Sequence, residues 1–323
     1  MRRTVLCPIW CPQTPLGTLA ESLVNMLDEM HLAPGVGIPK ILAGRFDLLA
    51  GLPGQAGLIS RGALLRQLAF LRTIAPEWAN THLLPGLNEQ NENAVELMSV
   101  VARSIAPQHS ELFNLLKPAI FHALEHERTE EAVREHLCGA LVGAAFAIIE
   151  GNSGFQLSSV ECRHTLTRMP NNVLTSMAWE LTSMLRGRDG AETKAAFWDE
   201  VIAPFLRDYW PNDVSARTPE VSENLAHLPG LAGDAFERAV DLVLDLIRPI
   251  QRYEVCYGLG LDDEEDFLAL QPRASLLLIS SILDRSAPPP QDLGEVLDRL
   301  LTADTEVAAE PAFWRLRQMC RTN

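Results

Sequence analysis

The sequence predicts an all-helical protein, because three observations agree. Apolar residues recur three and four positions apart through most of the chain, as at Leu64, Leu65, Leu68 and Leu71. Stretches in which apolar and polar residues alternate are rare, and no Asn-Gly or Asp-Gly pair lies between two such stretches. Proline, glycine and asparagine interrupt the helical periodicity at short intervals. Because short turns favour antiparallel neighbours, we expect a solenoid-like or HEAT-like array of antiparallel helices.

The interruptions define the expected elements in order. We expect helices at 16–24, 62–74, 76–87, 91–105, 110–126, 129–149, 158–167, 171–186, 191–209, 219–228, 233–247, 263–269, 272–284, 291–302 and 311–320. Ser158 or Ser159 can cap the helix that contains Glu161, because a serine hydroxyl accepts a hydrogen bond from a first-turn amide. Pro219 suits the start of a helix, where its missing amide hydrogen costs nothing. Gly187 and Gly190 end the helix expected at 171–186, around Arg186.

Glycine and proline are concentrated between Leu32 and Gly57. We therefore divide the chain into an irregular Gly/Pro-rich N-terminal segment, residues 1–57, and a helical array, residues 58–323. Two alternatives remain for this segment: its apolar side chains pack on the first helices of the array, or they dock on a partner chain. These side chains are Leu32, Val36, Ile38, Ile41, Leu42, Phe46, Leu48 and Leu49.

The composition is that of a folded protein, with 323 residues, 47% hydrophobic and 21% charged. The net charge of -15 and the isoelectric point near 5.0 argue against nucleic-acid binding, which relies on clustered lysine and arginine. The stretch from Arg163 to Arg188 carries several arginines, but they are spread thinly. We interpret it as a solvated helix face and expect no nucleic-acid partner.

Hydropathy and cysteine usage indicate a cytoplasmic protein. No apolar run reaches the roughly 18 residues that cross a bilayer, and the nearest, Leu137–Ile149, is expected to be a buried helix. Pro8 and Pro12 interrupt the segment where a signal peptide needs an unbroken apolar run. The six cysteines are scattered, which indicates reduced thiols. Cys7 and Cys11 lack the second pair of ligands that zinc requires.

Motifs for catalysis and cofactor binding are missing. The sequence contains no Walker-type phosphate loop and no G-x-S-x-G elbow. Gly258 and Gly260 form an isolated G-x-G pair, and the acidic run at 262–266 after it would repel a pyrophosphate. Cys162 and His164, two positions apart, would point to different sides of a helix. We therefore expect no catalytic residue, no cofactor and no metal, and predict that the protein is not an enzyme.

One cluster supports an alternative, a metal-dependent hydrolase. His122 and His126 are four positions apart and would share a helix face, with His136 not far away. Ala123 and Leu124 stand where a zinc protease of the H-E-x-x-H type needs its base. We therefore favour a solvated helix end over a metal site.

An aromatic-rich segment, Phe197–Pro211, resembles a known family, the helical domain of unknown function four-thousand-and-twenty. The resemblance covers roughly residues 45 to 320, and its motifs are packing motifs. It continues at Ser60–Arg66, Trp78–Pro85, Arg168–Pro170, Pro272–Ile279 and Phe313–Leu316.

Domains of that family typically follow sirtuin-like NAD-hydrolase modules in large bacterial proteins linked to phage defence. The resemblance therefore implies a non-catalytic helical scaffold or recognition subunit of an anti-phage defence system, which binds a partner effector or a phage-derived trigger. The implied protein partner is a sirtuin-like NAD-hydrolase or an ATPase. The sirtuin-like module is not part of this chain, so we expect a fragment, a separate subunit or a protein that has lost its effector.

Overall fold

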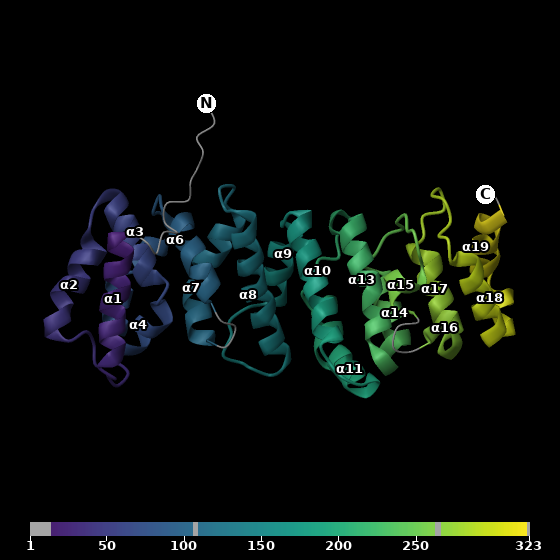
Figure 1. Ribbon diagram of the computed structural model, residues 1–323, viewed down its shortest axis with the longest axis horizontal. Coiled ribbons are helices and arrows are strands. Elements are labelled where there is room, and N and C mark those ends of the chain that lie inside the picture. The colour runs from purple at the N-terminus through teal and green to yellow at the C-terminus, as the bar shows by residue number, and fades with distance from the viewer. Residues whose placement is uncertain (1–13, 106–108, 262–265, 322–323) are drawn as a thin grey trace, which may run out of the picture. The chain divides into compact units, whose positions relative to one another are not determined.

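The computed structural model describes residues 14–105, 109–261 and 266–321. The regular elements in these ranges are helices, as Figure 1 shows, and the prediction of an all-helical protein is confirmed. Extended backbone pairs in the described ranges at one isolated parallel bridge, between Ile250 and Leu283.

The chain forms two compact units. The first contains the described residues up to Ala144 together with Ser153–Gln156, and the second contains Ala145–Asn152 and the described residues from Leu157 onward. The domain boundary expected between residues 57 and 58 lies inside a helix, α3.

The helices of the first unit are short and follow one another closely. They are α1 (Pro15–Glu29), α2 (Lys40–Gly51), α3 (Gly54–Leu65), α4 (Leu68–Ile74), α5 (Pro76–His82), α6 (Ala94–Val101), α7 (Ser110–Glu125) and the start of α8 (Glu131–Ile149), with 3-10 turns at Leu84–Leu87 and Ala102–Ser104. Their apolar faces form the core, where Phe46, Leu64, Leu65 and Phe113 are fully buried.

The prediction of an irregular segment between Leu32 and Gly57 is wrong, because α2 and the start of α3 lie there. Leu42, Phe46 and Leu49, spaced four and three apart, place one face of α2 in the core. Burial of this face outweighs the helix cost of Gly44, which is about 1 kcal/mol relative to alanine. The glycines in this region therefore do not prevent helix formation.

A close contact between α2 and α3 explains one of these glycines. The Ser60 hydroxyl donates a hydrogen bond to the Leu49 carbonyl oxygen at 2.6 Å, and Arg61 donates to the Leu52 carbonyl oxygen at 3.2 Å. A Cβ at Gly57 would lie 1.7 Å from that same Leu52 oxygen. Glycine is needed at position 57 because the end of α2 passes directly against it.

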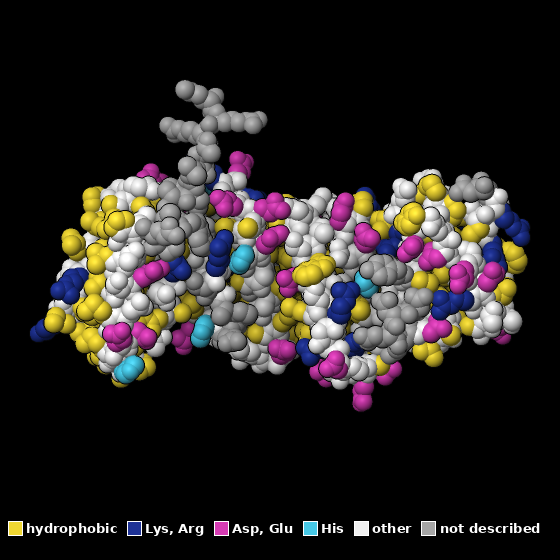
Figure 2. All heavy atoms as spheres, viewed as in Figure 1, with side chains coloured by type: hydrophobic (Ala, Val, Ile, Leu, Met, Phe, Trp, Pro, Cys, Tyr) yellow, Lys and Arg dark blue, Asp and Glu magenta, His cyan; other side chains and the backbone are white. Residues whose placement is uncertain are grey.

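The apolar side chains of this segment therefore divide into two groups. Leu42, Phe46 and Leu49 pack inside the chain, as the first alternative predicted, and the Phe46 ring meets the edge of Trp78 with centroids 5.5 Å apart. Others remain exposed, namely Val36 (62%), Ile41 (74%) and Leu48 (66%). Figure 2 shows hydrophobic side chains gathered over the α1 and α2 region of the first unit.

The second unit continues the helical pattern. It contains the end of α8, then α9 (Ser159–Thr167), α10 (Asn171–Arg186), α11 (Ala191–Phe197), α12 (Ala203–Asp208), α13 (Pro219–Leu231), α14 (Phe236–Leu244), α15 (Cys256–Leu259), α16 (Phe267–Leu270), α17 (Pro272–Ile282), α18 (Leu293–Ala303) and α19 (Pro311–Arg321). Shorter turns lie between them, at Trp198–Ile202, Val214–Ala216, Gly233–Ala235 and Thr305–Ala309.

Helix α9 begins at a capping box. The Ser158 hydroxyl accepts a hydrogen bond from the Glu161 amide at 3.2 Å, and the Glu161 carboxylate accepts one from the Ser158 amide at 2.9 Å. Of the two serines that could cap this helix, Ser158 does so. Pro219 stands in the first turn of α13, as expected from sequence.

The helix expected at 191–209 is interrupted by a π-helical turn, Trp198–Ile202. Pro204 has no amide hydrogen to donate to the carbonyl oxygen four residues earlier. The Ala203 amide instead donates to the carbonyl oxygen of Trp198, five residues earlier. Trp198, Phe205 and Trp210 from this aromatic-rich segment are all buried. The segment that carries the family resemblance is thus part of the hydrophobic core.

Helix α8 is long and apolar enough to cross a membrane by length and composition, and half of its most apolar window is buried within the chain. Leu137, Cys138 and Leu141 are fully buried on it, as the prediction of a buried helix for this stretch requires.

Candidate functional site

The three histidines of the alternative metal site do not form a common centre. His122 and His126 contact each other edge to face, with ring centroids 5.6 Å apart. The His126 Nδ1 atom accepts a hydrogen bond from the Arg128 amide at 3.2 Å. The His136 Nδ1 atom lies 2.6 Å from the Ala132 carbonyl oxygen. In the described ranges, no group of three or more histidine, cysteine, aspartate or glutamate side chains is placed to hold a metal ion. The Nδ1 atoms of His126 and His136 instead contact local backbone.

The arginine stretch from Arg163 to Arg188 is partly engaged in packing. The Arg163 guanidinium donates to the Arg207 carbonyl oxygen. The Arg188 guanidinium lies 3.5 Å from the centre of the Phe197 ring. Arg186, in the last turn of α10, is exposed. These arginines therefore do not act together as one basic patch.

The cysteines in the described ranges differ in burial. Burial raises the pKa of the Cys162 thiol to about 12, so it stays protonated and unreactive at neutral pH. Cys138 is also buried, whereas Cys256 and Cys320 are half-buried. Cys7 and Cys11 lie outside the described residues, as do the acidic residues 262–265.

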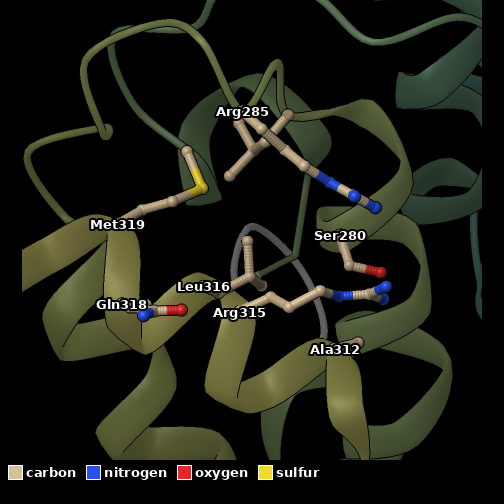
Figure 3. Close-up of a pocket in the computed structure, with 8 residues that line it drawn as sticks. Ser280, Arg285, Ala312, Arg315, Leu316, Gln318 and Met319 are labelled. Carbon is tan, nitrogen blue, oxygen red and sulfur yellow. The ribbon is translucent and has the colours of Figure 1, made fainter.

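A groove in the second unit combines charge with apolar surface. It lies between the end of α17, the loop after it and α19 (Figure 3). One part, of about 270 Å³, adjoins a second of about 740 Å³, and the two share part of their lining. The shared residues are Ser280, Leu283, Arg285, Ala312 and Arg315. We call these two adjoining hollows the α17–α19 groove.

Helix spacing explains one wall of the α17–α19 groove. Ala312, Arg315, Leu316 and Met319 lie three, one and three positions apart along α19, so they share one face of that helix. Leu316 is buried and anchors the helix, while the Arg315 side chain is exposed. This wall therefore presents an exposed arginine and the half-buried side chain of Met319.

The opposite side of the groove is set by the loop after α17. The Asp284 amide donates to the Ile250 carbonyl oxygen at 2.9 Å, beside the isolated bridge. The Asp284 carboxylate accepts hydrogen bonds from the amide and the hydroxyl of Ser286, at 2.9 and 2.8 Å. These hydrogen bonds lower the pKa of the Asp284 carboxyl group. They hold both neighbours of Arg285 in place, so the position of this arginine is defined by the backbone.

Arg285 and Arg315 differ from three nearby arginines of this unit, which form ion pairs. Arg273, Arg299 and Arg317 each pair with a carboxylate, Arg299 with Asp266 at 3.0 Å. Within the described part of the chain, neither Arg285 nor Arg315 has an ion-pair or hydrogen-bond partner for its guanidinium group. Two cationic groups are thus left free at one groove.

Figure 3 shows how the polar groups of the groove are directed. The guanidinium groups of Arg285 and Arg315 and the hydroxyl of Ser280 extend toward the same side. The Ser280 hydroxyl donates to the Leu277 carbonyl oxygen at 3.1 Å, and no histidine lines either part of the groove. The serine therefore lacks a neighbouring base to activate it as a nucleophile. Two guanidinium groups directed to the same side are suited to binding a negatively charged group.

The sequence predictions did not include this groove. Its lining comes from residues near 280–285 and from residues 310–319, which form no recognisable motif on their own. A local signal does exist in Pro311–Met319, where apolar and basic residues share the helix face. That neither arginine forms an ion pair in the described part of the chain could be known only once the chain was folded.

Comparison with known proteins found a relative that is similar to most of this chain. "Uncharacterized protein y4cA" of Sinorhizobium fredii (strain NBRC 101917 / NGR234) is 24% identical to this chain over 309 residues. The alignment covers 93% of this chain but 25% of that protein, so the chain spans about a quarter of its length. No protein-family model matches the chain, and no solved structure matches it.

Proposed function

We propose that this protein is a non-catalytic recognition or scaffold subunit that binds a protein partner. The observation that carries the proposal is the α17–α19 groove, where Arg285 and Arg315 stand without an ion-pair partner and Leu277 exposes an apolar side chain. Such a mixture of charged and apolar side chains is typical of protein-binding surfaces, in which arginine is enriched.

The helical architecture supports the same proposal. We propose that the helices form a solenoid-like or HEAT-like array, in which successive helices present an extended face to a partner. Exposed apolar side chains such as Ile41, Trp179 and Trp314 would then lie on surfaces available for binding.

The biological context of the proposal comes from the resemblance of Phe197–Pro211 and the further segments to domains associated with sirtuin-like modules. We propose that the subunit acts in a bacterial anti-phage defence system, and that its partner is a sirtuin-like NAD-hydrolase, an ATPase or a phage-derived trigger.

Co-expression tests the proposal directly. The full chain, carrying an affinity tag, is produced together with the products of its neighbouring genes, and the purified material is weighed by native mass spectrometry. We expect a complex of defined stoichiometry with one product, and we expect phage plaque counts to rise when the gene for this chain is deleted. Turnover of NAD or ATP by the purified chain alone, or stoichiometric zinc bound through His122 and His126, would overturn the proposal.

A further inference from the structure

We propose that the α17–α19 groove binds a short segment of the partner protein in which an acidic side chain stands next to an apolar one. This inference rests on the proposed function and specifies the chemistry of the partner. The acidic side chain would lie between the guanidinium groups of Arg285 and Arg315. The apolar side chain would contact Leu277, which lines the larger part of the groove and is 42% exposed.

Charge complementarity is the first argument. The chain carries a net charge of -15, and carboxylates compensate several other arginines of the same unit. In the described part of the second unit, Arg285 and Arg315 keep two positive charges free beside one groove. A carboxylate accepts two parallel hydrogen bonds from a guanidinium group, which makes arginine a specific partner for an acidic side chain.

The size of the groove limits the ligand to a short segment. The larger part measures about 740 Å³, within the range of roughly 300–1,000 Å³ that is typical of sites for small ligands. This volume accommodates a few side chains and not a whole protein surface. This protein has a net negative charge, so it would repel a partner that presents a large acidic surface. A short acidic segment is repelled less.

The lining argues against a nucleic acid or another polyanion. Asp284 and Glu310 also line the larger part of the groove, so its lining carries two anionic groups beside the two arginines. A phosphate backbone is bound by many cationic groups in a row, whereas this groove offers two arginines. One carboxylate beside an apolar side chain fits the observed surroundings better.

A labelled peptide provides the test. The probe is a fluorescein-labelled decapeptide in which glutamate and leucine alternate, and its binding to the full chain is followed by fluorescence anisotropy. A matched peptide carries lysine in place of glutamate. We expect saturable binding of the glutamate peptide, weakened by added salt, and no binding of the lysine peptide.

Variants of the groove locate the binding. Replacing both Arg285→Gln and Arg315→Gln should weaken binding of the glutamate peptide at least about tenfold, because two charge-assisted contacts are lost. Arg186→Gln is the matched control, since it removes an exposed arginine from the same unit outside the groove. Ala312→Asp places a carboxylate in the groove lining and should also weaken binding. This variant keeps the helix, because an acidic residue in the first turn of α19 is favourable.

Each result decides the inference. Equal binding of the glutamate and lysine peptides, or unchanged binding by the double variant, would overturn it, as would stronger competition by single-stranded RNA than by unlabelled glutamate peptide. Failure of the peptide to bind also overturns it, even when the chain still forms a complex with its partner. In that last case the proposed function stands and only the groove is excluded. Absence of any partner complex would overturn the proposed function instead.

Discussion

The carboxylate of Asp292 accepts a hydrogen bond from the backbone amide of Val255 through both of its oxygens, each 2.8 Å from the amide nitrogen. It also accepts a hydrogen bond from the Cys256 amide at 2.9 Å. These bonds tie the start of α15 to Asp292, the residue before α18, at the end of the loop that follows α17. Val255 is fully buried, so its amide has no access to water as a substitute acceptor.

We therefore predict that Asp292→Ala destabilises the second unit by about 1–3 kcal/mol, because buried amides lose their acceptor. Asp292→Asn keeps one acceptor oxygen and should cost less. Urea denaturation followed by circular dichroism measures both variants. Equal stability of Asp292→Ala and the wild-type chain would show that water or another group replaces the carboxylate.

The contact between α2 and α3 gives a second prediction. Gly57→Ala should destabilise the first unit by roughly 1–3 kcal/mol, because the new Cβ would lie 1.7 Å from the Leu52 carbonyl oxygen. Gly44→Ala is the matched control, since a Cβ there meets nothing within 4 Å and alanine favours the helix. Thermal unfolding of the two variants should shift in opposite directions. A shift in the same direction would mean that α2 does not pass against residue 57.

The capping box of α9 gives a third prediction, with its control one residue away. Ser158→Ala should cost about 0.5–2 kcal/mol of stability, because the Glu161 amide loses its acceptor and Glu161 loses its reciprocal partner. Ser159→Ala, at the first helical position, should stay within about 0.5 kcal/mol of the wild-type chain. Equal losses in the two variants would contradict this assignment of the cap.

Cys162 gives a prediction on pH dependence. The folded state raises the pKa of its thiol from 9.0 to about 12, so the unfolded chain releases this proton at a lower pH than the folded chain. The contribution of this group to stability is therefore full below pH 9 and is lost as the pH rises toward 12. In that window the free energy of unfolding should fall by roughly 1 kcal/mol per pH unit for this group.

The test compares how steeply the stability of two proteins falls with pH, and not their stability at one pH. Urea midpoints are measured from pH 8 to pH 10.5 for the wild-type chain and for Cys162→Ala, which also creates a small cavity. We expect the variant to show the weaker loss of stability at alkaline pH. Parallel curves for the two proteins would mean that another group causes the alkaline dependence.

The helical class and most helix positions could be predicted from the amino-acid sequence, because these depend on local interactions. The helix at 171–186 begins and ends where it was expected, since its apolar periodicity and the glycine after it are sufficient. Ser158 was one of two serines expected to cap α9, because capping uses atoms within one turn. Local patterns also predicted that Leu137–Ile149 is helical and buried.

Other features depend on residues far apart in sequence, so they follow from the folded structure and could not be predicted from local patterns. Helix α2 forms in a Gly/Pro-rich stretch because Leu42, Phe46 and Leu49 gain burial against neighbouring helices, and this gain exceeds the local helix cost. The α17–α19 groove depends on the approach of two elements, and the freedom of its arginines depends on where carboxylates lie after folding. Arg273 forms an ion pair with Asp304, 31 positions away, whereas Arg285 forms no ion pair in the described ranges. Such charge pairing is a property of three-dimensional distance, which local sequence patterns do not contain.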